Sequence, residues 1–439
     1  MGKMKKKCVA SILALGLSVV MFTVGCGGSK ATTDDENKAK EEQQVTLKIM
    51  HHMSEEAKQK GLQDVVDSFM EQNADIKIEL EFIEERDYLT NLKTKIASGD
   101  APDFIHYLPA KVPELIEAEQ VVPLDESALG GINKSLMESV TFDGKVYAIP
   151  LDVGGMGYFY NKDMFEEAGI TELPKTFSEF VKVCDTLSKG EDGVIASGFK
   201  DGWTMQTVWE SYMYGTLSRM NESYVADAES GKVKFADNKL FKLMAEDFEK
   251  LMEYCGNEAA LGKDYATQCA EFASGKYPIC IQGSWAVSQI RAGNQDANIG
   301  YASLPMTENP EDLTFAAQVD DALMLSSQCE HSKEAKKFID YLATTEAGEI
   351  FSKNAQVISA VQDVDSSNLD PTLQEIQKIS QSDEAYYFEK HPRFSGQFST
   401  DFTSIMTEWG TNIITGNNME IEELAKTMDD DFENIRATQ

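Results

Sequence analysis

The amino-acid sequence predicts an α/β protein built on parallel sheets. Residues 45–53 (VTLKIMHHM) alternate apolar and polar side chains as a strand does, and a helical pattern begins at Ser54. Alternation returns at residues 75–84, and a helical stretch at 88–98 leads to a third strand at 103–108. Strand, helix, strand, helix, strand favours a parallel sheet with helices on both faces.

Helical periodicity recurs through the rest of the chain. Glu55 and Glu56 stand at the positive end of the first helix, and ligands of such sheets bind beyond the carboxyl ends of the strands, here near residues 51–54 and 106–111. A second α/β body is expected over about residues 155–300. Its helices and those that close the chain are expected at 176–187, 205–217, 240–254, 331–342 and 421–432. We expect their apolar stripes to be core rather than partner surfaces.

Composition excludes two classes of protein. The chain has 40 Lys and Arg against 74 Asp and Glu, a formal charge of −34, whereas nucleic-acid binders need a basic face. Disorder of the whole chain is excluded because 42% of the residues are hydrophobic. At about 100–200 residues per domain, 439 residues predict two or three domains.

The N-terminus has the pattern of an export signal. Lysines within residues 3–7 precede an uncharged run, residues 8–25, that ends in small residues before Cys26. This ending resembles a bacterial lipobox, in which the cysteine is lipidated, although Thr23 stands where lipoboxes usually carry Leu. The alternative is a retained transmembrane helix. We expect residues 1–25 to be a lipoprotein signal peptide and the protein to be lipid-anchored at the extracellular face of a bacterial cell membrane.

The residues after the signal are expected to form a disordered tether. Ala is the only apolar residue type between Ser29 and Gln44, so residues 26–44 cannot bury enough surface to fold. A frayed terminus without a role leads to the same expectation. Loss of residues 1–25 takes the formal charge from −34 to −38, which suits a monomeric domain that stays in solution at a membrane surface.

Five cysteines remain beyond Cys26, namely Cys184, Cys255, Cys269, Cys280 and Cys329. Their odd number and the lack of a C-x-x-C pair argue against a disulfide framework and against a zinc or redox site. We expect buried free thiols, and one bridge among the three cysteines from 255 to 280 is the alternative.

Five segments, taken in order, resemble one protein family. They are GKVYAIP at 144–150, YFYNKD at 158–163, and the stretches 272–290, 298–306 and 319–348. With these segments the sequence is similar to family 1 extracellular solute-binding proteins, the maltose-binding-protein-like lipoproteins that capture sugars for bacterial ABC importers. The likeness extends over nearly the whole mature chain.

The resemblance implies a two-lobed periplasmic-binding-protein fold of type II. Each lobe is expected to be a mainly parallel sheet flanked by helices, and three chain crossovers join the lobes at a hinge. We expect lobe 1 to comprise residues 45–152 and 301–362, and lobe 2 residues 153–300 and 363–439. The crossovers are expected near 152–157, 300–304 and 362–366. Gly154, Gly155 and Gly157 are expected to give the first crossover backbone freedom.

Sugars present flat C–H faces and hydroxyl groups, so their sites combine aromatic rings with polar side chains. Trp285, in a turn after Gly283, corresponds to the family's stacking tryptophan. Trp203, in a polar loop, and Tyr107, past the third strand, stand where relatives present further rings. Packing in the core is the alternative for these rings, and His106 is the alternative to Tyr107 as the inward-pointing residue.

Acidic residues near two crossovers are further candidates. Asp152 enters the hinge, and Asp320 and Asp321 lie in the return segment, where relatives often have small residues. They either accept hydrogen bonds in an acidic pocket or belong to a solvated turn.

Four more candidates follow from where the first helix and residues 394–402 approach the cleft in this family. They are Glu55, Arg393, Phe398 and Phe402. Trp209 and Trp409 are expected to be core residues.

No metal, cofactor or catalytic site is expected. His51, His52 and His106 could meet at one cleft, but neighbours on a strand point to opposite faces, so His51 and His52 cannot both ligate a metal easily. The sequence has no H-E-x-x-H, G-x-S-x-G or P-loop motif, and its carboxylates are too numerous to single out an acid/base pair.

The resemblance therefore implies a non-catalytic receptor. It would trap a mono- or oligosaccharide between its lobes and deliver it to the permease and ATPase subunits of an ABC transporter. The same fold with a cationic ligand such as a polyamine is an alternative suggested by Asp152, Asp320 and Asp321. A surface-anchored glycan hydrolase is a third possibility, disfavoured by the missing motifs.

Overall fold

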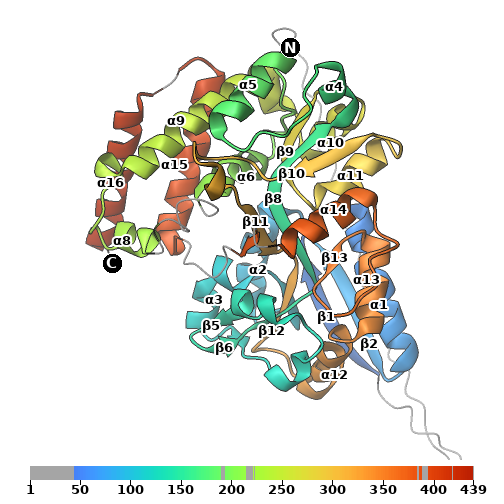
Figure 1. The fold of residues 1–439 in the computed structure, drawn as a ribbon. Helices are drawn as coiled ribbons and strands as arrows, with labels where there is room; N and C mark the ends of the chain where they lie inside the picture. Colours follow the sequence, from blue (N-terminus) through green and yellow to red (C-terminus); the bar gives the residue numbers. More distant parts are fainter. Residues whose placement is uncertain are drawn as a thin grey trace, which may run out of the picture. The chain divides into compact units, whose positions relative to one another are not determined.

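The computed structural model describes residues 44–188, 193–213, 221, 223–382, 385–387, 394–417 and 419–438. The expected signal peptide, Cys26, nearly all of the tether and Arg393 lie outside the described residues. The described chain forms two larger sheets with helices packed on them, and a short pair of strands, β5 (Thr141–Phe142) and β6 (Lys145–Val146) (Figure 1).

The first sheet has the strand order β2-β1-β3-β12-β4, with β7 paired to β12. Its strands are β1 (Val45–His51), β2 (Ile76–Phe82), β3 (Phe104–His106), β4 (Val121–Val122), β7 (Ala148–Pro150) and β12 (Ala322–Ser326). β1 is parallel to β2 and to β3, which confirms the parallel core expected from the sequence. β12 returns antiparallel to β3, β4 and β7.

Amphipathic helices cover this sheet. They are α1 (Glu56–Gln72), α2 (Glu85–Ser98), α3 (Pro113–Glu117), α12 (Ser332–Leu342) and α13 (Thr345–Ala355). Along α1, Leu62, Val65, Val66 and Phe69 are buried, as their spacing predicts. α1 packs closely on α13, because a Cβ on Gly61 would lie 2.7 Å from the Cβ of Ala355. This approach explains the glycine in the helix interior.

The second sheet is organised around the long strand β8 (Asp152–Asn161). The other strands are β9 (Ile279–Gly283), β10 (Ile299–Ala302), β11 (Phe315–Val319), β13 (Ile358–Ser359) and β14 (Ala385–Tyr387). β9, β10, β11 and β13 all run antiparallel to β8, and β14 is parallel to β11. The expectation of a mainly parallel sheet in each lobe is therefore wrong for the second sheet. The reason is that the four strands that pair with β8 all run in the opposite direction to it.

Ten helices of the described residues accompany this sheet. They are α4 (Lys162–Glu167), α5 (Phe177–Leu187), α6 (Gly202–Tyr212), α8 (Tyr224–Glu229), α9 (Lys239–Tyr254), α10 (Tyr265–Ala273), α11 (Ala286–Gly293), α14 (Pro371–Ser380), α15 (Gly396–Ile414) and α16 (Ile421–Thr438). α9, α15 and α16 pack together, as Figure 1 shows. Trp209 and Trp409 are 1% and 2% exposed in the core between these helices, as expected.

The chain passes between the sheets at three places. It leaves β7 and enters β8 across Leu151, and it returns from β11 to β12 across Asp320 and Asp321. We expected that return near residues 300–304 and placed residue 301 onward in lobe 1. That boundary is wrong, because β10 and β11 both pair with β8 and residues 301–319 belong with the second sheet. A third passage leads from α13 of the first-sheet body to β13, which pairs with β8, and on to α14, which packs on β10.

The glycines at the first passage have a steric role in this conformation. Gly154, Gly155 and Gly157 lie within extended β8, and none has a positive φ. A Cβ on Gly155 would lie 2.1 Å from the ring of Phe315, and one on Gly157 would lie 2.4 Å from the carbonyl oxygen of Ala302. Close packing of neighbouring strands, rather than backbone freedom, requires glycine there.

The five cysteines of the described residues are free thiols, as expected. Four are buried, Cys329 is half-buried, and no bridge joins Cys255, Cys269 and Cys280. No helix within the described part of the chain is both long enough and apolar enough to cross a membrane.

Candidate functional site

A cavity of about 700 Å³ is walled by residues from the bodies of both sheets. The first sheet contributes the ends of β1 and β3 and the start of α1, which is the edge where the sequence predicts ligand binding. The second sheet contributes the start of α6, the turn before α11, and α15. The volume of the cavity falls within the roughly 300–1,000 Å³ typical of small-molecule sites.

Three half-buried aromatic rings line this cavity. Tyr107 follows β3 and stacks on Tyr88, with 5.8 Å between the ring centroids and planes 13° apart. Trp285 follows β9, and its indole Nε1 donates a hydrogen bond to Oε1 of Gln282 at 3.2 Å. Trp203 lies in the first turn of α6 rather than in the loop we expected, and its ring is 4.8 Å from that of Tyr265. Aromatic rings from the bodies of both sheets therefore line the cavity.

A buried hydrogen bond beside the cavity joins the bodies of the two sheets. The hydroxyl of Tyr265, on α10, donates to Oε1 of Glu55 at 3.1 Å. Glu55 stands just before α1 and is 6% exposed, and burial raises its pKa against the opposing effect of Lys58. The buried carboxyl group of Glu55 therefore joins the start of the first helix to the second-sheet body through this hydrogen bond.

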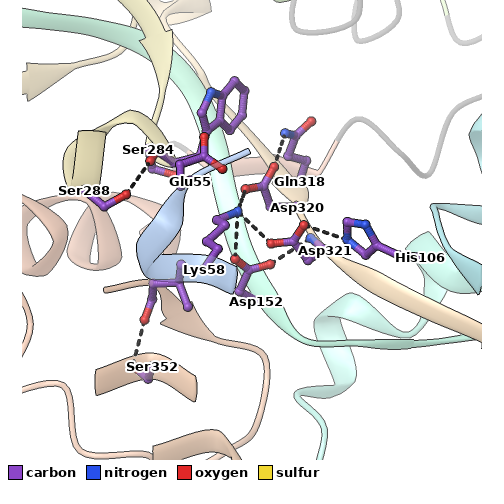
Figure 2. Close-up of polar contacts among 12 residues, drawn as sticks. Glu55, Lys58, His106, Asp152, Ser284, Ser288, Gln318, Asp320, Asp321 and Ser352 are labelled. Atoms are coloured by element: carbon purple, nitrogen blue, oxygen red, sulfur yellow. Dashed lines mark hydrogen bonds and ion pairs between the residues drawn. The ribbon is translucent and has the colours of Figure 1, made fainter. Parts of the chain in front are cut away.

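A buried lysine joins two acidic residues that line the cavity to a third that lies behind its wall. Nζ of Lys58 lies 2.5 Å from Oδ2 of Asp320, 2.6 Å from Oδ2 of Asp321 and 3.4 Å from Oδ2 of Asp152 (Figure 2). Oxygens of these three carboxylates approach one another as metal ligands do, but the ammonium group of Lys58 already fills the place between them. The site therefore needs no metal ion.

The protonation of this cluster follows from burial and from Lys58. Burial and the neighbouring charge of Asp321 raise the pKa of Asp152 well above its usual range. Burial also acts on Asp321, but the ammonium of Lys58 and the hydrogen bond with His106 outweigh it and lower the pKa of Asp321. The three carboxylates outweigh the effect of burial on Lys58 and raise its pKa. An ion pair of Lys58 with Asp321 and Asp320 results.

Histidines lie beside this cluster, and of His51, His52 and His106 it is His52 that lines the cavity. Nε2 of His106 is 2.8 Å from Oδ1 of Asp321, and its Nδ1 accepts from the backbone N–H of His52 at 3.4 Å. Burial, followed by the charge of His52, lowers the pKa of His106, so the neutral ring with a proton on Nε2 fits both contacts. The ring of His51 lies near that of Phe82 instead, as the alternation of strand side chains requires.

The remaining candidates divide between wall and core. Phe402 is 1% exposed and reaches the cavity wall, whereas Phe398 packs its ring 4.8 Å from that of Phe432 and does not line the cavity. Asp152 is likewise behind the wall, 1% exposed and paired with Lys58. Asp320 and Asp321 do line it, and the position of Arg393 lies outside the described residues.

Comparison with known proteins assigns the chain to a family. The sequence profile of a family described as "bacterial extracellular solute-binding protein" matches residues 54–349. The chain belongs to this family. A protein of this family binds a solute outside the cytoplasm and does not transform it, so the protein is a non-catalytic component of an ABC importer.

Relatives of this solute-binding protein match most of its length. A "multiple sugar-binding protein" of Streptococcus mutans is 26% identical over 415 residues, which is 92% of this chain and 94% of the relative. A diacetylchitobiose binding protein, DasA of Streptomyces coelicolor, is 26% identical over 315 residues, covering 69% and 70%. A solved chitin oligosaccharide binding protein superposes with a TM-score of 0.77 at 21% identity, covering 90% of this chain and 99% of that one, which shows the shared fold.

Sequence reasoning missed two residues of this solute-binding protein's site: Lys58, which lines the cavity, and Tyr265, which lies behind its wall. Lys58 precedes Leu62 by four positions and so continues the apolar stripe of α1, and a lysine on a buried stripe requires acidic partners. This signal was present in the sequence. Tyr265 had none, because only the packing of α10 brings its hydroxyl to Glu55.

Proposed function

We propose that this solute-binding protein captures a carbohydrate in the cavity and delivers it to an ABC transporter permease. The observation that carries the proposal is the set of aromatic rings, Tyr107, Trp203 and Trp285, on walls contributed by both sheets. Such rings match the C–H faces of sugars, and the surrounding carboxylates and amides match their hydroxyl groups. Relatives named for multiple sugars, maltodextrin and diacetylchitobiose support the same class of ligand.

An oligosaccharide suits the cavity better than a single sugar ring. The cavity volume of about 700 Å³ lies in the upper half of the usual range for small-molecule sites, roughly 300–1,000 Å³. The three aromatic side chains also stand on different elements, so they can contact more than one sugar unit. Binding contacts made by both walls exist only when the two walls are close together, so the ligand stabilises that arrangement by its differential affinity. The permease would then recognise the loaded form.

Thermal shift and titration calorimetry with a ligand panel test this function. The panel holds glucose, maltotriose, raffinose, diacetylchitobiose and xylotriose, with spermidine as the cationic comparison. We expect at least one oligosaccharide to raise Tm and to be recovered unchanged by chromatography. Stabilisation by spermidine alone, or release of a hydrolysis product, would contradict the proposal.

The structure weakens the cationic alternative. That alternative rested on Asp152, Asp320 and Asp321, and all three already contact the ammonium group of Lys58. A polyamine would have to compete with a tethered lysine that is 3% exposed.

We also propose that a lipid on Cys26 anchors the protein to the membrane, with residues 26–44 as tether. The export signal before Cys26 supports this, and a Streptococcus pneumoniae relative, 24% identical over 376 residues, is named a maltooligosaccharide solute-binding lipoprotein. Expression of the full chain with radiolabelled palmitate should label the wild-type protein, and Cys26→Ser should abolish the label and release the protein into the medium. Equal labelling of both would contradict lipidation at this residue.

A further inference from the structure

The ammonium group of Lys58 lies where the first two chain passages between the sheets contact each other, the one from β7 to β8 and the one from β11 to β12. Leu151 donates its backbone N–H to the carbonyl of Asp321 at 2.8 Å, and Asp321 donates its own N–H to Oδ1 of Asp152 at 2.7 Å. One passage therefore ends at Asp152 and the other contains Asp320 and Asp321. Since Lys58 belongs to α1 of the first-sheet body, a single side chain binds both passages to that body.

One carboxylate of the three differs from the others in its exposure. The side chain of Asp320 is 16% exposed and lines the cavity, whereas those of Asp152 and Asp321 are 1% and 7% exposed. Its Oδ2 contacts Lys58, and its Oδ1 accepts a hydrogen bond from Nε2 of Gln318 at 3.3 Å (Figure 2). A carboxylate offers about four acceptor positions, so two donors leave Asp320 able to accept from a ligand.

Lys58 decides how Asp320 meets that ligand. A partly exposed side chain ordinarily samples several rotamers, and ordering it on binding costs conformational entropy. The ammonium group, itself fixed by Asp321 and Asp152, holds Asp320 in one place before the ligand arrives. A hydrogen bond from a ligand hydroxyl to a charged group is roughly twice as strong as one between neutral groups.

We propose that Lys58 is a positioning residue for ligand capture: it orients the Asp320 carboxylate as an acceptor for a ligand hydroxyl and couples that contact to both hinge passages. The inference rests on the proposed function, since it requires a ligand that carries hydroxyl groups. Because Lys58 acts through Asp320, substitution of Asp320 should weaken ligand binding only when Lys58 is present.

A double-mutant cycle tests this dependence. Removal of Lys58 alone would leave buried negative charge uncompensated, so the cycle is built on Asp321→Asn, whose side-chain oxygen can still accept from His106. Lys58→Met and Asp320→Asn are added to this background singly and together. The charge lost with Lys58 then balances the charge lost with Asp321.

Calorimetry measures the Kd of each variant for the panel oligosaccharide that binds the wild-type protein most tightly, and each Tm is recorded. With Lys58 present, Asp320→Asn should weaken binding by about 10–100-fold, as for other hydrogen bonds to charged groups. With Met at position 58, the same change should weaken binding less than about threefold, because the two effects are coupled. Lys60→Met, on the exposed side of the same helix, is the matched control and should bind as wild type does.

Equal factors in the two backgrounds, or full affinity in Asp320→Asn, would overturn the inference while the proposed function stands. Absence of carbohydrate binding by the wild-type protein would refute the proposed function and this inference with it. A lower Tm in the Lys58→Met variants, with the effect of Asp320→Asn on Kd the same whether or not Lys58 is present, would show that the lysine is purely structural. This result would also overturn the inference.

Discussion

The indole of Trp285 should contribute more to ligand affinity than any other single ring of the cavity. A Cβ on Gly283 would lie 2.1 Å from the six-membered ring, so the backbone covers one part of the indole while the side chain still lines the cavity. Stacking a sugar on the open part removes on the order of 80 Å² of apolar surface from water, worth about 2 kcal/mol at about 25 cal/mol per Å². That free energy corresponds to about a 30-fold change in Kd.

Trp285→Ala should exceed this value because it also removes a donor. Oε1 of Gln282, a residue with no exposed surface, loses the hydrogen bond from the indole, and an unpaired buried acceptor costs about 1–3 kcal/mol. We therefore expect Trp285→Ala to raise Kd by at least about 30-fold in calorimetry. Trp285→Phe, which keeps a ring and loses the donor, should fall between Ala and wild type.

Trp409→Phe is the matched control, since Trp409 lies in the core between α9 and α15 with its Nε1 donating to the carbonyl of Met419 at 3.1 Å. It should lower Tm and leave Kd unaltered. Ligand binding should change the tryptophan fluorescence of the wild type and of Trp409→Phe, but not that of Trp285→Ala to the same extent. A Kd for Trp285→Ala within twofold of wild type would refute the assignment of this ring as a platform.

Two further predictions concern buried hydroxyl–carboxyl pairs. Burial raises the pKa of Asp247 from 3.8 to about 7 although Tyr212 donates a hydrogen bond to it. The unfolded chain ionises this carboxyl near its ordinary pKa of 3.8 while the folded protein keeps it protonated up to about 7, so folding stability is lost as pH rises from the first value through the second. Asp247→Asn should therefore match wild type near pH 4 and exceed it by up to about 4 kcal/mol at pH 8 in urea unfolding, and a constant difference between the two pH values would contradict this. Tyr265→Phe removes the hydrogen bond to Glu55 that joins the two sheet bodies, and it should raise Kd for every panel ligand by a similar factor of about 5–10. A change for one ligand only would indicate direct contact instead.

Local pattern was enough to predict most individual elements. The alternation at residues 45–51 and 76–82 and the stripe of α1 report which side faces a sheet, because burial of an apolar face requires that periodicity. The position of Trp285 after a strand was also predictable, as was the burial of Trp409. The passage between the sheets at Asp320 was misplaced, because strand pairing is set by partners far along the chain and β11 carries no mark of its partner β8.

The sequence by itself determined an exported, acidic α/β protein with two sheet-based bodies, a likeness to solute-binding proteins, and the aromatic residues that could meet a sugar. Only the tertiary structure decided the electrostatics of the site. Asp152, Asp320 and Asp321 suggested a place for a cation, and the cation proved to be Lys58 of the same chain, 262 positions before Asp320. Charges separated so far in sequence interact only when folding brings them within a few ångströms and removes the water between them. The composition gives the number of such charges, but only the fold determines which of them form ion pairs.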